Sequence, residues 1–405
     1  MTVADNVMLG QEPGRGLAVH RKELRRRFLE LSEQVGFSLD PDARLGTLRR
    51  SEQQKAEILR AVARDARLIV MDEPTAALSS DEARQLVRVT RRLAAEGRTI
   101  VFVSHHLDEV LAVCDTITVL RDGKYVRTGS SKTETPDSLV TSMTGNSLAS
   151  EYPPKSKQAR TGTPALRVSN LSSSTGLKGI DLEIWPGEVL GIAGLVGSGR
   201  SELARAIFGA DPHDGTIEIN GEKTRIGSVR RAIDAGIAML PENRKELGLM
   251  LDRSVTENVS IPQLPRLARF SKVRKRLEQS SVDEMLAKVG VRASAAHAAV
   301  GTLSGGNQQK VMFAKWLMTG PRIFIADEPS QGVDVGARAR IYELIADMAH
   351  QGMAVLIISS ELEEVIGLAN RVLVMRKGQI VSELADGSVH PDAILAHAFG
   401  TAVAS

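Results

Sequence analysis

The chain repeats its own sequence at a constant spacing. Four segments of the first half recur in the second half at one offset of 255 residues, with no gap between the first match and the last. The matches are Gly-Thr-Leu at 46–48 and 301–303, an apolar run with Asp-Glu-Pro at 68–74 and 323–329, 103–104 with 358–359, and 121–124 with 376–379. Chance does not keep a register over this length, so the repeat predicts two domains of the same fold.

The second copy extends further toward the N-terminus than the first. Residues 2–7 still match 254–259, at an offset of 252, but residues 164–253 have no counterpart, because the first copy would need to begin before Met1. We therefore expect the first domain to lack roughly its first third. The expected organisation is an incomplete first domain at 1–128, a polar, proline-containing linker at 129–163, a second domain at 164–390 and a C-terminal tail at 391–405.

Short apolar runs in the second copy predict buried parallel strands, and helical patterns such as 337–349 lie between them. The runs are 189–192, 323–326, 354–358 and 372–375. Strands that alternate with helices indicate an α/β fold with a doubly wound, mostly parallel sheet. The first copy carries the counterparts of the last three runs. We expect its strand at 68–71 to lose the counterpart of the strand at 189–192 as a neighbour, because that counterpart lies in the missing segment, and this would leave residues 1–128 marginally stable on their own.

A glycine-rich loop is the most informative segment of the second copy. It follows the apolar run 189–192 and opens a helix, which is the setting of a phosphate-binding loop. Glycines let successive backbone N–H groups turn toward an anion, and the helix start adds a positive dipole end. The alternative is an ordinary glycine turn before a helix. The candidate nucleotide-binding residues are Gly194, Gly197, Ser198, Gly199, Arg200 and Ser201, and the hydroxyl of Ser201 is also a candidate Mg²⁺ ligand.

One position of this loop departs from the usual pattern, which has lysine where this chain has Arg200. Both side chains are cationic, but lysine is a compact point charge and arginine is a longer planar fork. We therefore expect Arg200 to hold phosphate without reproducing the position that lysine takes between the β- and γ-phosphates.

An acidic pair ends the apolar run in both copies, as Asp72-Glu73 and Asp327-Glu328, each followed by proline. At the end of a buried strand, the aspartate can hold Mg²⁺ through water and the glutamate can orient or deprotonate an attacking water. Taken alone, such a pair is more often a helix cap or a salt bridge. Because it occurs twice, we interpret Asp72 and Asp327 as metal-binding residues and Glu73 and Glu328 as catalytic carboxylates.

Composition excludes several other classes of protein. A net charge of +3 and 13 aromatic residues argue against binding of nucleic acid, and the single cysteine, Cys114, rules out an internal disulfide. No apolar run approaches the ~20 residues of a membrane-spanning helix, and the N-terminus lacks the features of a signal peptide. We therefore expect a cytosolic chain whose membrane role, if it has one, comes through a partner.

The segment Leu-Ser-Gly-Gly-Asn-Gln-Gln at 303–309, about 24 residues before Asp327, resembles the signature of the ATP-binding subunits of ABC transporters. The resemblance covers nearly the whole chain. The tandem copies, the loop at 194–201 and Pro-Glu-Asn-Arg at 241–244 look like the monosaccharide importers of the ribose, galactose and xylose type. It implies tandem P-loop NTPase domains with a helical subdomain, which bind ATP and Mg²⁺.

In that family two domains pair head to tail, and the signature of one faces the γ-phosphate held by the other. The resemblance makes Ser304, Gly305 and Gly306 nucleotide-binding residues. It makes His105 of the first copy the catalytic switch histidine, whereas the second copy has Ser360 at this place. As an alternative, His105 is an ordinary histidine at a strand end. Glu242 replaces the glutamine of the loop that faces the permease, and we include it among the metal candidates.

The pairing predicts two unequal composite sites. One combines Glu73 and His105 with the intact signature but lacks a phosphate loop. The other combines the loop at 194–201, Asp327 and Glu328 with the degenerate signature of the first copy, Arg49-Arg50-Ser51. Losing a positioned general acid or base slows a reaction by about 10²–10⁴-fold. We therefore predict that the second site binds ATP–Mg²⁺ but hydrolyses it slowly or not at all, and that the first would be fast if it had its loop.

The resemblance implies the ATP-binding, ATP-hydrolysing subunit of a sugar importer. Such a subunit lies on the cytoplasmic face of the cell membrane, held there by integral-membrane permease subunits, and works with a separate sugar-binding protein. A second hypothesis is a hydrolytically inactive, truncated nucleotide-binding or regulatory fragment. A third, a soluble ABC ATPase of DNA repair or translation, is less favoured because the charge is near neutral and zinc-binding cysteines are absent.

Overall fold

The computed structural model describes residues 1–15, 18–75, 78, 80–104, 106–121, 123–144, 152–156, 160–195, 197–270 and 272–400. The chain forms two compact units, Met1–Leu148 and Ala149–Ser405. Within the described residues, no helix combines the length and the apolar character that crossing a membrane requires.

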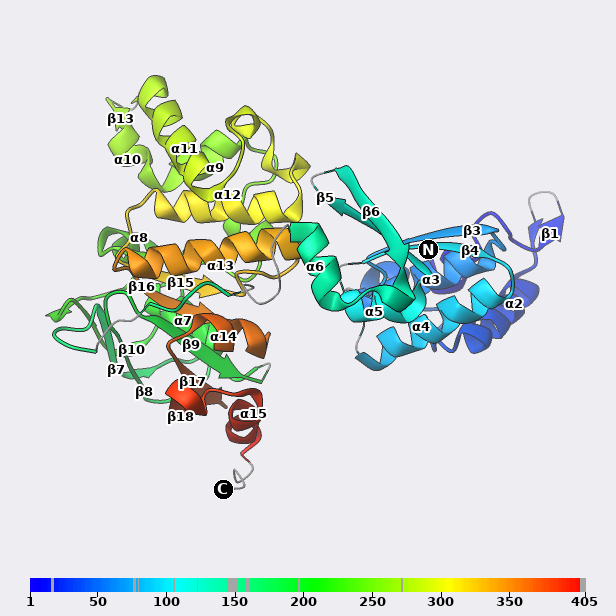
Figure 1. Cartoon of the computed structure of the whole chain (residues 1–405), viewed down its shortest axis with the longest axis horizontal. Coiled ribbons are helices and arrows are strands. Elements are labelled where there is room, and N and C mark those ends of the chain that lie inside the picture. Colours follow the sequence, from blue (N-terminus) through cyan, green and yellow to red (C-terminus); the bar gives the residue numbers. More distant parts are fainter. Residues whose placement is uncertain are drawn as a thin grey trace. The chain divides into compact units, whose positions relative to one another are not determined.

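The second unit is built around a six-stranded sheet with the order β12-β15-β16-β9-β17-β18 (Figure 1). All neighbours are parallel except β17 and β18. The sequence prediction of a mostly parallel α/β sheet is therefore confirmed. The strands are β9 Val189–Gly194, β12 Ile237–Leu240, β15 Ile323–Asp327, β16 Ala354–Ile358, β17 Arg371–Arg376 and β18 Gln379–Ala385.

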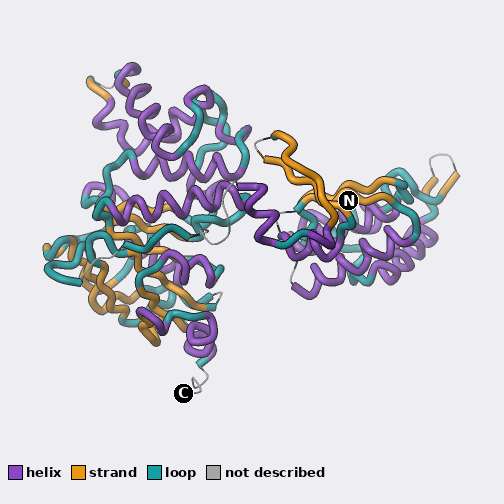
Figure 2. Tube along the Cα trace, viewed as in Figure 1, coloured by secondary structure: helices purple, strands orange, loops and turns teal. Residues whose placement is uncertain are grey.

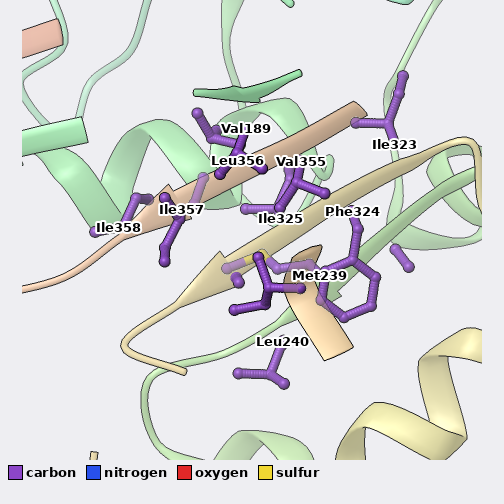
Figure 3. Packing of buried hydrophobic residues seen from close by; sticks show 14 of the residues in the cluster. Val189, Met239, Leu240, Ile323, Phe324, Ile325, Val355, Leu356, Ile357 and Ile358 are labelled. Carbon is purple, nitrogen blue, oxygen red and sulfur yellow. The ribbon is translucent and has the colours of Figure 1, made fainter. Parts of the chain in front are cut away.

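The central strands are buried on both faces, which explains why they read as continuous apolar runs. Every residue of β15 and β16 is buried. Figure 3 shows Phe324 and Ile325 of β15 packed among Met239 of β12 and Val355 and Leu356 of β16. The helices that flank or follow these strands are α7 Arg200–Ile207, α8 Val229–Asp234, α13 Val335–His350, α14 Leu362–Leu368 and α15 Pro391–Phe399.

Two further layers complete the second unit. Figure 2 shows helices gathered beyond one side of the main sheet and a second group of strands beyond the other. The strands form an antiparallel sheet of order β11-β10-β7-β8: β7 Leu166–Ser172, β8 Ile180–Ile184, β10 Asp214–Ile219 and β11 Glu222–Lys223. The helical group contains α9 Val255–Ser260, α10 Leu264–Leu267, α11 Lys275–Val289 and α12 Gly305–Leu317, with a short hairpin of β13 Ala268–Arg269 and β14 Lys272–Val273.

The first unit repeats this arrangement in part. Its helices are α1 Val3–Val7, α2 Arg21–Val35, α3 Arg50–Ala63, α4 Ser80–Ala95, α5 Leu107–Val113 and α6 Pro136–Thr144. Its strands are β1 Gly14–Arg15, β2 Ala18–Val19, β3 Leu68–Asp72, β4 Thr99–Val103, β5 Thr116–Arg121 and β6 Lys124–Ser130. Part of β6 and all of α6 lie in residues 129–163, where the sequence predicts a linker. Likewise, α15 lies in the expected tail.

The sheet of the first unit is split into two pairs. β3 and β4 form one parallel pair and β5 and β6 form one antiparallel pair, in the same register as β15–β16 and β17–β18. In the second unit β9 joins these pairs, because it lies between β16 and β17. The prediction that β3 loses the phosphate-loop strand as its neighbour was therefore wrong. The strands beside that position are β4 and β5, whereas the counterpart of β3 pairs with β12.

One face of the split sheet leaves apolar side chains exposed. Leu68 of β3 is 55% exposed, whereas its counterpart Ile323 is 0% exposed. Val70 and Val103 are also exposed, although their counterparts in β15 and β16 are buried. A groove of about 780 Å³ runs between β4 and β5, where the second unit has β9 between the corresponding strands. The apolar residues of β3 and β4 thus follow the pattern of a buried sheet that is only half covered.

Candidate functional site

The glycine-rich loop connects β9 to α7. Gly199 is the N-cap of α7 and has a φ of 104°, a conformation that favours glycine. A Cβ atom on Gly194 would collide with the backbone carbonyl of Met375 and come within 2.6 Å of the Ser198 hydroxyl. The loop therefore follows a path that side chains at Gly194 and Gly199 would obstruct. Gly197 has a φ of 80°, and Val196 lies outside the described residues.

The loop presents groups that suit a phosphate. The Ser198 hydroxyl is buried and has no hydrogen-bond partner among the described residues. An unpaired buried polar atom is costly, so the site favours a ligand that supplies an acceptor or donor there. The start of α7 follows directly, with backbone N–H groups and a positive dipole end.

Ser201 and Asp327 meet at the carboxyl end of the sheet. The hydroxyl of Ser201 donates to Oδ1 of Asp327 at 3.2 Å, and Asp327 is 2% exposed. Burial raises the pKa of Asp327 to about 7, and the negative charges of Glu242 and Glu328 contribute in the same direction. A cation would relieve this unfavourable burial of charge. Hydroxyl and carboxylate oxygens are ligands that Mg²⁺ prefers, so these residues fit that metal.

Glu328 is held beside Asp327 by its backbone and by Ser360. Its φ is 50°, in the left-handed region, and its N–H donates to the carbonyl of Ile358 at 2.8 Å. The Ser360 hydroxyl donates to Oε2 of Glu328 at 3.1 Å. Burial raises the pKa of Glu328. Glu73 of the first unit has the same backbone geometry, with a φ of 45° and an N–H donated to Val103, so the repeat extends to this strained residue.

Arg200 lies across the ends of β15 and β16. Its Nη1 donates to the carbonyl oxygen of Ser359 at 2.6 Å, and its Nη2 lies 3.9 Å from Oε1 of Glu328. The guanidinium thus links the phosphate loop to the segment after β16 and to the acidic strand end. A lysine has no planar fork with which to contact both groups at once.

The signature residues begin α12. Ser304 is its N-cap and accepts a hydrogen bond from the N–H of Asn307. A Cβ atom on Gly305 would come within 2.8 Å of the carbonyl oxygen of Gly332, and one on Gly306 within 2.6 Å of Cβ of Ala337. Among the described residues, no hydrogen bond or ion pair joins this helix start to the phosphate loop. The glycines therefore allow close packing within their own unit as well.

The predicted residues of the first copy are less enclosed. Asp72 is exposed and Glu73 is half-buried, whereas Asp327 and Glu328 are buried. His105 lies outside the described residues, so its predicted role is not examined by the geometry. Glu242 is exposed, although its charge acts on Asp327 and Glu328. The composite sites that combine both copies stay predictions.

Sequence reasoning missed two residues that organise the site. Arg244 donates to the carbonyl oxygens of Gln331 and Gly332, at 2.7 and 3.0 Å, and so ties the loop after β12 to the loop after β15. Glu364 of α14 is fully buried beneath Ser330 and Ser359, and burial raises its pKa to about 7. The repeat held a signal for Glu364, because its counterpart Glu109 is also a glutamate.

Comparison with known proteins identifies the family. The profile of the ABC transporter family matches residues 177–331. The protein named ribose import ATP-binding protein RbsA in Rhodococcus jostii is 40% identical over 407 residues, which cover all of this chain and 80% of that protein. The protein of the same name in Geobacillus kaustophilus is 41% identical and covers 99% of this chain. The chain belongs to the ABC transporter ATP-binding proteins.

Solved structures agree on the fold of this ABC protein. A nucleotide-free ATP-binding cassette from an ABC transporter superposes with a TM-score of 0.51 and 23% identity, covering 57% of this chain and 95% of that one. The ADP conformation of the ATP-binding cassette MJ1267 also gives 0.51, at 22% identity, covering 59% and 100%. These structures agree with the predicted P-loop ABC fold, and the relatives that align with the whole chain confirm the predicted family of ATP-binding proteins.

Proposed function

We propose that this chain binds ATP together with Mg²⁺ and couples ATP hydrolysis to the uptake of a ribose-like monosaccharide. It would act on the cytoplasmic face of the membrane, attached to separate permease subunits that receive sugar from a binding protein. The observation that carries the proposal is the Ser201–Asp327 hydrogen bond of 3.2 Å, because it brings the end of the phosphate loop to the acidic strand end. The names of the relatives supply the sugar class.

Each residue has a distinct task in the proposed reaction. The backbone of the loop at 194–201 and the start of α7 hold the phosphates, and Arg200 supplies a positive charge beside them. Ser201 and Asp327 would hold Mg²⁺, which neutralises charge on the phosphates when it is bound. Glu328 orients the attacking water, and the hydroxyl of Ser360 fixes its carboxylate at 3.1 Å.

We also propose that this site turns over slowly. Glu328 faces a cation, Arg200, at 3.9 Å, and its other oxygen is bound by Ser360 rather than by a histidine. Arg200 opposes the rise that burial gives the pKa of Glu328 and so limits the gain in basicity, and Ser360 lacks the charge of a histidinium. The predicted faster composite site, of Glu73 and His105 with the signature Ser304-Gly305-Gly306, would be fast only with a phosphate loop of the first domain, which this sequence does not contain.

The proposed domain organisation keeps the predicted domains 1–128 and 164–390, and adds α6 of the expected linker 129–163 to the first and α15 of the expected tail 391–405 to the second. The alternative of an inactive regulatory fragment is not favoured, because proteins named ribose import ATP-binding protein align with the whole chain. An ATPase of DNA repair or translation is not favoured for the same reason.

Equilibrium binding and turnover of labelled ATP test the proposal. We expect the purified chain to bind ATP only with Mg²⁺ present and to hydrolyse it slowly, at a rate that Glu328→Gln lowers to background. Asp327→Asn should abolish the Mg²⁺-dependent binding of ATP, whereas Glu284→Gln, which changes an exposed carboxylate on α11, should leave it unchanged. Absence of ATP binding would refute the proposed site. Turnover at ordinary transporter rates by this chain alone would refute the slow second site.

A further inference from the structure

A strongly basic segment lies at the end of the helical group in the second unit. We name residues 264–277, which run from α10 through β13 and β14 into α11, the basic hairpin. It carries no acidic residue and therefore a local charge of +6, twice the net charge of +3 of the whole chain. Figure 1 shows it at the opposite end of this unit from β7 and β8. Its cations are Arg266, Arg269, Lys272, Arg274, Lys275 and Arg276.

An aromatic side chain projects from this hairpin. Phe270, between β13 and β14, is 88% exposed, more than any other large apolar residue in the described part of the chain. Its ring lies 5.2 Å from the guanidinium carbon of Arg269. Phe270 has a φ of 51°, which costs a bulky residue energy that glycine would not incur. Phe270 contributes little buried area to the fold, so its exposed ring suits a contact with a partner outside the chain.

Hydrogen bonds and an ion pair hold the basic hairpin in place. The N–H of Arg274 donates to the carbonyl of Leu267 at 3.0 Å, and its Nη2 donates to the carbonyl of Arg266 at 2.8 Å. Leu267 is buried. Lys275 pairs with the buried Glu278 at 3.0 Å. The structure therefore uses Arg274 and Lys275 to hold the hairpin.

The other cations face solvent. Arg266, Lys272 and Arg276 are exposed and have no ion pair among the described residues. Arg269 is exposed beside Phe270. Four positive charges and one aromatic ring are thus available to an external partner.

The first unit shows that the fold itself does not need these cations. Its own hairpin, β1 and β2 before α2, lies at an offset of 254 from β13, β14 and α11. The corresponding residues 10–23 carry three arginine and lysine residues and two glutamates, for a charge of +1. One of those cations, Arg21, pairs with Asp5. The high charge therefore belongs to the second copy alone.

We propose that the basic hairpin binds the surface of a bilayer that contains anionic phospholipid. The cations would contact headgroup phosphates, and Phe270 would insert at the boundary between headgroups and acyl chains. Each lysine or arginine near such a surface contributes about fivefold in affinity. A single exposed aromatic ring flanked by cations is the amphipathic pattern of an interfacial anchor. This contact is with lipid, so it adds to the proposed attachment through a permease and does not depend on it.

Sedimentation of the full chain with lipid vesicles tests this. We expect binding to vesicles with about 30% phosphatidylglycerol, none to pure phosphatidylcholine, and release at high salt, because salt shortens the reach of the charges. The combined Arg266→Gln, Lys272→Gln and Arg276→Gln variant should lose at least about tenfold in affinity. The control, Arg21→Gln with Lys22→Gln at the start of α2 after the hairpin of the first unit, should bind as the unchanged chain does.

Two further measurements keep the outcome decisive. ATP binding by the triple variant should be unchanged, which shows that it folds. Brominated phosphatidylglycerol vesicles should quench the tryptophan fluorescence that Phe270→Trp adds to the chain. This quenching locates the ring in the interface even if the triple variant is unstable. Equal binding to neutral and anionic vesicles, or no quenching, would overturn the proposal. So would tighter binding of the hairpin to a single-stranded RNA than to anionic vesicles at the same salt concentration. Failure of the unchanged chain to bind ATP would instead count against the proposed nucleotide site, and not against the proposed lipid contact.

Discussion

Arg200 holds the phosphate loop against the end of the sheet while it is also the cation nearest the proposed catalytic carboxylate. Its guanidinium hydrogen-bonds to the carbonyl of Ser359 and lies 3.9 Å from Glu328. Bound phosphate would compete for the same fork. Nucleotide binding is then expected to draw Arg200 away from Glu328. One side chain would therefore couple nucleotide binding to the freedom of the Glu328 carboxylate to orient water.

Substitution of Arg200 should separate charge from shape. Arg200→Ala is expected to weaken ATP binding about 10- to 100-fold, because charge-assisted hydrogen bonds contribute roughly 1.5–3 kcal/mol. Arg200→Lys should keep most of the affinity, since the positive charge remains. Isothermal titration with Mg²⁺ present measures both. Arg205→Ala, on the same helix but paired with Asp211, is the matched control and should bind as the unchanged chain does. An Arg200→Ala variant with full affinity would contradict this role.

Glu364 should make stability depend on pH. Burial raises its pKa to about 7, from an ordinary value of 4.5. The unfolded chain therefore releases this proton near pH 4.5, whereas the folded chain keeps it until about pH 7. The free energy of unfolding should fall as pH rises between these values, by up to about 3 kcal/mol. Denaturant unfolding from pH 5 to 8 measures this. Glu364→Gln should show a weaker pH dependence, and an unchanged slope would exclude this carboxyl as a cause.

The sequence predicted those site residues that belong to short motifs of neighbouring residues. Glycines before a helix, and Asp-Glu after an apolar strand, predict phosphate and metal contacts without knowledge of the fold. The Ser360–Glu328 hydrogen bond and the contacts of Arg244 with residues 331–332 join segments that are distant along the chain. Such contacts depend on sheet order and loop direction, which local spacing does not contain.

At the scale of helices and strands, the start of α12 depends on close packing. A Cβ atom on Gly306 would lie 2.6 Å from Cβ of Ala337 on α13. We expect Gly306→Ala to lower stability by about 1–3 kcal/mol, as overpacking does. Thermal unfolding of the second unit measures the loss. Gly387→Ala is the matched control, because no atom lies within 4 Å of a Cβ there, and it should be nearly neutral. Equal effects of the two changes would contradict tight packing at Gly306.

The two copies of the same strand should respond differently to truncation. Ile323→Ala removes a fully buried side chain from β15 and should cost about 2–5 kcal/mol. Leu68→Ala, at the matching position of β3, should cost less than about 0.5 kcal/mol, because Leu68 is 55% exposed. Denaturant unfolding with a probe in each unit compares them. A large cost at Leu68 would mean that this face of β3 is covered in solution.

Apolar runs predicted the central strands well because burial on both faces leaves an unbroken signal. The strands predicted at 323–326 and 354–358 match β15 and β16 to within one residue. The predicted neighbour of β3 was wrong, because the sheet order of the second unit places β9 between β16 and β17 and not beside β15, the counterpart of β3. Chain order does not reveal that crossover, although β3–β4 and β5–β6 keep the register of β15–β16 and β17–β18.

At the scale of the whole molecule, the two units differ in how their cores are connected. The buried apolar residues of the second unit form one continuous cluster, whereas those of the first form two. The break falls between β4 and β5, whose facing edges no described strand pairs. Cooperative stability comes from a shared core, so the first unit is expected to open at lower cost.

Limited proteolysis should reveal this difference and its response to ligand. We expect the first cuts within residues 1–128 and later cuts within 165–385, because cleavage follows local opening. ATP with Mg²⁺ should slow cutting only in the second unit, since a ligand at 100 times its Kd stabilises its own site by about 2.7 kcal/mol. Mass spectrometry of the fragments gives the order. Asp327→Asn supplies the control, as its second unit should gain no protection. Protection of the first unit by nucleotide would contradict this prediction, and would instead support a contribution of the signature segment 49–51 to the bound site.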